Sequence, residues 1–149
     1  MTEIRFYQLS TTSLEQALPR VLEKVLALGQ RAVVVAGSEE RVEALAVALW
    51  TYDDRSFLPH GTARDGAAAD QPVWITTREE NPNGAHMLVL VDGASAATIA
   101  AWPSVCIFFD AGDDTALAAT RENWRSWKAA GHTVKYFKQG ERGGWEQAG

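Results

Sequence analysis

The chain has 149 residues, a formal net charge of −5 and an apolar content of 46%. This length and composition predict a single folded domain, residues 1–149, rather than a disordered chain. The one cysteine, Cys106, excludes an internal disulfide and a cysteine metal cluster, and fits a cytoplasmic location. No apolar run approaches membrane-spanning length and the first residues carry no export signal, so we expect no membrane contact.

The charge is divided unevenly along the chain. Residues 1–114 contain 8 basic and 16 acidic residues, a net charge of −8, whereas residues 115–149 carry a net charge of +3. An acidic body does not favour binding along the phosphates of nucleic acid, so we expect any association with nucleic acid to be indirect. The small basic region is closer in size to a peptide site.

Apolar runs and helical periodicity alternate along the chain. The apolar runs predict strands over residues 3–9, 31–36, 72–76, 87–91, 105–109 and 133–137. Helical periodicity predicts helices capped by Thr12 or Ser13, by Ser38 and near Asp113, with a weaker helix over residues 94–101. This order predicts an α/β fold, a three-layer sandwich with a mostly parallel sheet and Rossmann-like topology without a nucleotide-binding loop.

Two segments lack a regular pattern. Residues 51–71 form a predicted loop of a length that is uncommon in compact domains and is usually functional. This loop contains Tyr52, Phe57 and Leu58 near its start, which are side chains that loops seldom expose. Residues 140–149 are rich in glycine, and we expect them to form a flexible tail. Trp145 is the residue in this tail with enough apolar surface to fold back onto the domain.

The predicted helix that follows residue 113 has an apolar stripe with a row of cations beside it. At 100° per residue, the stripe contains Ala116, Thr120, Trp127 and Gly131, and its flank contains Leu117 and Trp124. The next positions round the helix are Arg121, Arg125 and Lys128. An apolar niche beside a guanidinium suits a ligand that is both apolar and anionic. The alternative is a core helix with a solvated basic face.

The sequence offers little catalytic chemistry. Asp92 and Asp110 each follow an apolar strand, as in the magnesium-binding half of a P-loop enzyme, but no glycine-rich phosphate loop accompanies them. The three histidines are isolated from other metal ligands, and Cys106 lies within an apolar run. We therefore expect no catalytic residue, cofactor or metal site. The alternative is a metal- or nucleotide-dependent α/β enzyme that uses Asp92 and Asp110.

Four segments carry a resemblance to a known family. They are ALW at residues 48–50, SFLPH at 56–60, QPVWI at 71–75 and RENWR at 121–125. In their order and spacing these segments resemble the chi subunit of bacterial DNA polymerase III, and the resemblance covers nearly the whole chain. It implies a small non-catalytic accessory of the clamp loader. Such a protein binds the acidic C-terminal tail of single-stranded DNA-binding protein, which ends Asp-Asp-Ile-Pro-Phe.

The resemblance also implies roles for individual residues. The tail-binding arginine of the family falls on Arg121, its aromatic neighbour on Trp124 and the adjoining cation on Arg125, with Lys128 as a further cation. A family lysine one turn earlier falls on Leu117, which removes one positive charge from the site.

A second surface follows from the same resemblance. In the family, this surface binds either the psi subunit or, in its place, a repair helicase. The residues of the surface fall on Trp50 and Phe57, followed by Leu58, Pro59 and His60. Ordinary core packing is the alternative for Trp50. Direct binding of single-stranded DNA through the tryptophan and arginine edge is a third possibility, which the negative net charge disfavours. The sequence thus predicts an adaptor that links protein-coated single-stranded DNA to the clamp loader or a helicase.

Overall fold

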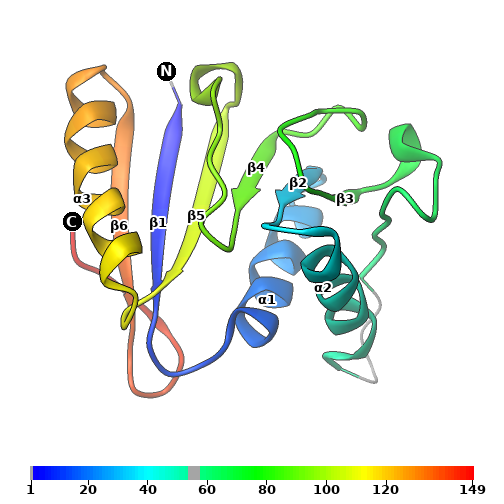
Figure 1. Ribbon diagram of the computed structural model, residues 1–149, viewed down its shortest axis with the longest axis horizontal. Coiled ribbons are helices and arrows are strands. Elements are labelled where there is room, and N and C mark those ends of the chain that lie inside the picture. The colour runs from blue at the N-terminus through cyan, green and yellow to red at the C-terminus, as the bar shows by residue number, and fades with distance from the viewer. Residues whose placement is uncertain (1, 54–57) are drawn as a thin grey trace.

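A seven-stranded sheet forms the centre of the protein in a computed structural model that describes residues 2–53 and 58–149 (Figure 1). The strand order is β3-β2-β4-β5-β1-β6-β7, and all neighbours are parallel except β6 and β7. The strands are β1 (Glu3–Leu9), β2 (Ala32–Val35), β3 (Val73–Thr76), β4 (Met87–Leu90), β5 (Ser104–Asp110), β6 (Thr133–Gln139) and β7 (Trp145–Gln147). This arrangement confirms the predicted α/β fold with a mostly parallel sheet.

In the described part of the chain, three helices cover the two faces of the sheet. Helices α1 (Leu14–Ala27) and α2 (Glu39–Thr51) pack on one face, and α3 (Asp114–Ala129) packs on the other. Successive residues of β1 point to opposite faces, as expected for a strand: Tyr7 and Leu9 join the core under α1 and α2, whereas Ile4 and Phe6 join the core under α3. Figure 1 shows α2 and α3 toward opposite ends of the sheet.

Helix α1 is capped by Ser13 rather than by Thr12. The hydroxyl of Ser13 accepts a hydrogen bond from the Gln16 backbone N–H, and the Gln16 side chain accepts one from the Ser13 backbone N–H, which forms a capping box. Of the two caps that the sequence allowed, Ser13 is therefore the one that α1 uses. Thr12 instead accepts a hydrogen bond of 2.7 Å from the buried side chain of Gln139.

The weak helix expected over residues 94–101 is also wrong. Only a 3-10 turn, Ile99–Ala101, forms there. The segment is held in place by the carboxylate of Glu79, which accepts hydrogen bonds from the backbone N–H groups of Ala97 and Thr98, the Thr98 hydroxyl and the Trp102 indole. Burial acts to raise the pKa of Glu79, but these hydrogen bonds outweigh it and lower the pKa below its usual value.

We expect Glu79→Gln to lower the free energy of unfolding near neutral pH by about 1–2 kcal/mol, because the amide cannot replace a carboxylate that accepts four hydrogen bonds. Since the pKa is lower in the folded state, the carboxylate stabilises the fold above pH 4.5 and loses this effect as the pH falls toward the folded-state pKa. Urea denaturation at neutral and acidic pH measures both effects. The exposed Glu141→Gln serves as the control, and equal stability of the two variants would contradict the expectation.

Residues 140–149 contain a strand, so the expectation of a flexible tail is wrong for this segment. Strand β7 pairs with the end of β6, and Gly143 adopts a φ of +83° in the turn between them. Trp145 folds back onto the sheet, where its ring packs edge-on against Tyr7 with the ring centroids 4.9 Å apart. Burial of this indole explains how a glycine-rich segment is ordered.

The long loop between α2 and β3 is anchored at its second half. Gly61 forms a parallel bridge with Trp74, with hydrogen bonds to Val73 and Ile75, and so covers the outer edge of β3. A 3-10 turn, Ala68–Asp70, follows. None of the helices in the described residues has the length and apolar character needed to cross a membrane.

Candidate functional site

The predicted apolar stripe lies on α3 and faces the sheet. Thr120 is buried, Ala116 and Trp127 are partly buried, and the Trp127 ring stacks on Phe6 with the centroids 5.8 Å apart. Gly131 is not part of this stripe, because α3 ends at Ala129 and Gly131 adopts a φ of +92° beyond the helix. The side of α3 that packs against the sheet is thus the side that the periodicity predicted.

A row of cations follows the outer edge of α3. Arg121, Arg125 and Lys128 are all exposed, and the Nζ atom of Lys128 lies 5.4 Å from the ring centroid of Trp124. Within the described ranges, no ion pair engages any of these three cations. Leu117 is partly buried against the core beneath α3. The edge therefore combines available positive charge with apolar surface.

Trp124 lies between the row of cations and the sheet. Its ring centroid is 6.3 Å from that of Phe6 and 6.2 Å from that of Tyr136 in β6. The Tyr136 hydroxyl donates a hydrogen bond to the side chain of Gln8. Burial raises the pKa of Tyr136, and the positive charge of Arg121 opposes this rise. Arg121, Trp124 and Tyr136 thus form one polar-aromatic site, which we call the α3 edge together with Arg125 and Lys128.

The second predicted surface divides into exposed and buried parts. Trp50 is 53% exposed at the end of α2, and its ring packs on His60 with the centroids 4.4 Å apart. Leu58 is only 2% exposed and belongs to the core, so its prediction as an anchor for a partner is wrong. The His60 ring is also buried, with its nitrogens 2.7 Å from the Leu58 carbonyl and 3.0 Å from the Ala46 carbonyl. Pro59 is half-buried.

Phe57 lies outside the described residues. Val47, which the sequence analysis did not single out, is 59% exposed one turn before Trp50 on α2. An apolar residue three positions before Trp50 is the signal that could have identified it. The described part of this surface therefore consists of Val47, Trp50 and Pro59, supported from beneath by His60.

Asp92 has a structural role in this fold. Its carboxylate accepts hydrogen bonds from the Gly37 backbone N–H at 3.3 Å and from the Arg41 guanidinium at 3.1 Å, and Arg41 also pairs with Glu15 at 2.9 Å. A Cβ atom at Gly37 would lie 3.1 Å from the Cβ of Asp92, so the close approach of these two segments favours glycine. This network joins α1, α2 and the end of β4 through one oxygen, Oδ2, of the Asp92 carboxylate.

Asp110 is exposed at the end of β5, next to a cavity of about 370 Å³ that Asp92 and Asp113 also line. The described residues contain no group of three or more His, Cys, Asp or Glu side chains that could hold a metal ion. Burial raises the pKa of Cys106 to about 12, which disfavours the thiolate form that a cysteine nucleophile requires.

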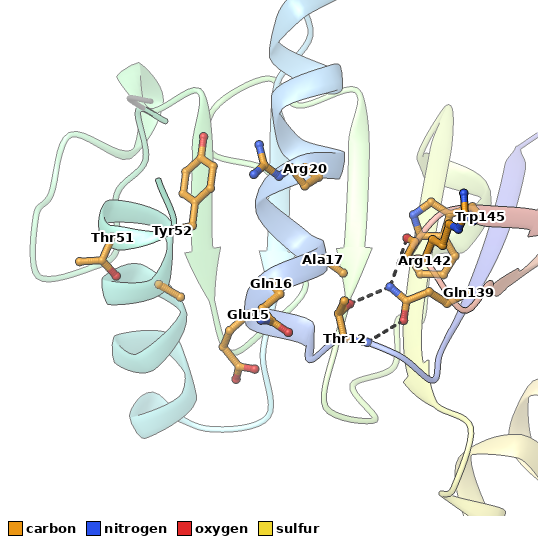
Figure 2. Close-up of a pocket in the computed structure, with 12 residues that line it drawn as sticks. Thr12, Glu15, Gln16, Ala17, Arg20, Thr51, Tyr52, Gln139, Arg142 and Trp145 are labelled. Carbon is orange, nitrogen blue, oxygen red and sulfur yellow. Dashed lines mark hydrogen bonds between the residues drawn. The ribbon is translucent and has the colours of Figure 1, made fainter. Parts of the chain in front are cut away.

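A larger cavity of about 560 Å³ lies between α1, the end of α2 and the β6–β7 hairpin (Figure 2). Gln139 bridges across one side of it, donating to Thr12 and accepting from the backbone N–H groups of residues 10–12. Arg20 lies 5.6 Å from the ring centroid of Tyr52 and 3.7 Å from the Glu23 carboxylate. The polar groups of this cavity are therefore largely used to join neighbouring elements.

Comparison with known proteins decides the family. The family model described as "DNA polymerase III chi subunit, HolC" matches residues 1–135. The chain belongs to the DNA polymerase III chi subunit family. A relative from Rickettsia prowazekii (strain Madrid E), named "Probable DNA polymerase III subunit chi", is 32% identical over 99 residues, which are 66% of this chain and 60% of the relative. The "DNA polymerase III subunit chi" of Escherichia coli (strain K12) is 22% identical over 123 residues, 83% of this chain and 84% of the relative.

Membership of the chi family identifies a DNA replication accessory protein. Both predicted surfaces lie within the matched range, because α3 ends at Ala129 and the Trp50 surface precedes it in the chain. Strand β7 and the residues after it lie beyond the matched range. The chi-family match therefore covers the α3 residues of the α3 edge, but neither Tyr136 nor the residues that follow it.

Proposed function

We propose that this chi-family protein is a non-catalytic adaptor of DNA replication and repair. In this role it binds the acidic C-terminal tail of single-stranded DNA-binding protein and links it to the polymerase III clamp loader or a helicase. The observation that supports the proposal best is the α3 edge, where three exposed cations lie beside a partly exposed indole. A tail that ends in an apolar side chain, a carboxylate and upstream aspartates complements this combination.

The positions of these side chains support a particular set of contacts with a docked tail. Arg121 would bind the terminal carboxylate, because a guanidinium donates two parallel hydrogen bonds to such a group. The terminal phenylalanine ring would pack beside Trp124. Arg125 and Lys128 would attract the upstream aspartates over a longer distance. Leu117 would add apolar surface where a lysine would add charge.

Titration of a labelled peptide that ends Asp-Asp-Ile-Pro-Phe tests this proposal. We expect saturable binding that weakens as the salt concentration rises, since part of the attraction is between exposed charges. A peptide without the last phenylalanine should bind very weakly, because it lacks both the ring and a correctly placed carboxylate. Absence of binding by the complete peptide would contradict the proposal.

The second surface would bind the psi subunit or a repair helicase. Helix α2, which carries Val47 and Trp50, lies toward the opposite end of the sheet from α3 (Figure 1), so both partners could bind the same molecule at once. Contact with DNA would then be indirect, through the coating protein. This role would be performed in the cytoplasm, where the bacterial chromosome is replicated.

We expect Trp50→Ala to abolish co-purification of that second partner, because large aromatic side chains dominate such interfaces. The melting temperature should change little, since the side chain is 53% exposed. Affinity for the tail peptide should be unchanged and provides the control. A large fall in the melting temperature with the partner still bound would instead assign Trp50 to the core.

A further inference from the structure

Residues 148 and 149 continue past β7 and run beside β6 on the side of Tyr136. The Ala148 backbone N–H donates to the Tyr136 carbonyl at 2.8 Å, and the Tyr136 backbone N–H donates to the Gly149 carbonyl at 3.2 Å. The Gln147 side chain donates to the same Gly149 carbonyl at 3.1 Å. We call residues 148–149 the strap, because they extend the strand pairing beyond β7 to the α3 edge.

The strap lies against the ring that the α3 edge would offer to a ligand. A Cβ atom built on Gly149 would be 3.1 Å from Cη2 and 3.5 Å from Cζ2 of Trp124, and 3.6 Å from Cβ of Tyr136. Phe6 is already near this indole from the core side, and the Lys128 ammonium lies over the ring. The strap therefore covers the benzene edge of Trp124, where the side chain of a docked peptide would make its apolar contact.

The strap can be displaced at low cost. It is held by two backbone hydrogen bonds and one from a side chain, and both of its residues are exposed. Ala148 and Gly149 contribute almost no apolar side chain, so they cover Trp124 without filling the space as an aromatic ring would. Trp145 remains packed on Tyr7 and Phe108, which would keep β7 in place while the strap moves.

We propose that the strap is a built-in competitor of the tail peptide. Docking of an aromatic side chain at Trp124 displaces residues 148–149 from β6, and the cost of this displacement lowers the affinity of the site. The inference rests on the proposed function of the α3 edge. The strap lies beyond residue 135, where the chi-family match ends. The competition that we propose is therefore a property of this chain and not of the matched region.

Ala148→Pro tests the competition, because proline removes the N–H that donates to Tyr136 and leaves the charge of the protein unchanged. We expect this variant to bind the tail peptide 3- to 10-fold more tightly, with the same salt dependence as the wild-type protein. Ala148→Ser keeps the N–H and is the matched control, with wild-type affinity expected. Equal affinities for wild type and Ala148→Pro would overturn the inference while leaving the tail-binding proposal intact.

Amide hydrogen exchange provides a second readout that does not depend on affinity. The Tyr136 N–H donates to the strap, so a saturating peptide should accelerate exchange at Tyr136 while exchange in α3 slows. Slower exchange at both positions would show that the peptide binds with the strap in place, and would overturn the inference. If neither wild type nor Ala148→Pro binds the peptide, the proposed function itself fails and the inference fails with it.

Discussion

Replacement of Arg121 by alanine should weaken binding of the tail peptide by roughly 10- to 100-fold, which corresponds to about 1.4–2.8 kcal/mol. Arg121 is exposed on α3 and unpaired among the described residues, and its charge acts on the phenol of Tyr136 next to Trp124. In the docked state the guanidinium would bind a terminal carboxylate against this aromatic surface, where partial loss of water strengthens the contact. Removal of the guanidinium leaves that carboxylate without its main partner.

Fluorescence anisotropy of a labelled peptide measures the difference between wild type and Arg121→Ala. The neighbouring Glu122→Ala is a suitable control, because this residue is also exposed on α3 but points away from Trp124 at 100° per residue. Arg125→Ala should cause a smaller loss, which grows at low salt, because its contact with the peptide is more exposed. Equal affinities of wild type and Arg121→Ala would show that the row of cations is only a solvated face.

Replacement of Leu58 by alanine should reduce the free energy of unfolding by about 2–5 kcal/mol, the usual cost of removing a large buried aliphatic side chain. Leu58 is 2% exposed and belongs to the core under α1 and α2, which also contains Leu45 and Leu49. Its place in the long predicted loop, next to Phe57, and the family resemblance led us to expect a partner contact, but the structure shows a core residue. Stability, rather than partner binding, should therefore respond.

Urea denaturation of Leu58→Ala and Leu28→Ala gives a matched comparison. Both variants remove the same atoms, but Leu28 is 74% exposed at the end of α1, so its replacement should change stability by less than about 0.5 kcal/mol. If Leu58→Ala were as stable as Leu28→Ala and lost its partner instead, the original prediction of an anchor would be reinstated.

The parts of the fold that could be predicted are those in which local pattern and burial agree. The apolar runs at residues 31–36, 87–91 and 105–109 became parallel strands in the middle of the sheet, where both faces are covered. Helix α3 was predictable because its apolar positions repeat at the helical period. For the same reason the positions of Arg121 and Trp124 on one edge could be derived before the structure was known.

The predictions that proved wrong concern segments whose local structure is determined by residues far away in the chain. The alanines of residues 94–101 favour a helix, but Glu79 binds the backbone N–H groups of Ala97 and Thr98 and holds an irregular segment instead. Trp145 orders a glycine-rich stretch because Tyr7 and Phe108 provide an apolar surface more than thirty residues away in the chain. The contact between Gly149 and Trp124 depends on the same sheet pairing, and no periodicity in the sequence encodes it.

The position of β1 in the sheet has a consequence for how the chain folds during synthesis. Among the described strands, β1 pairs with β5 and β6, which are made about 100 and 130 residues later. While the intervening chain emerges from the ribosome, β1 has no strand to pair with, and Ile4 and Phe6 lack the α3 residues that later cover them. The apolar side chains of β1 therefore stay exposed until β5 and β6 have been made. Pairing between β1 and strands so much later in the chain gives the fold a high contact order. We therefore expect the protein to fold slowly and to need protection from aggregation until β6 is made.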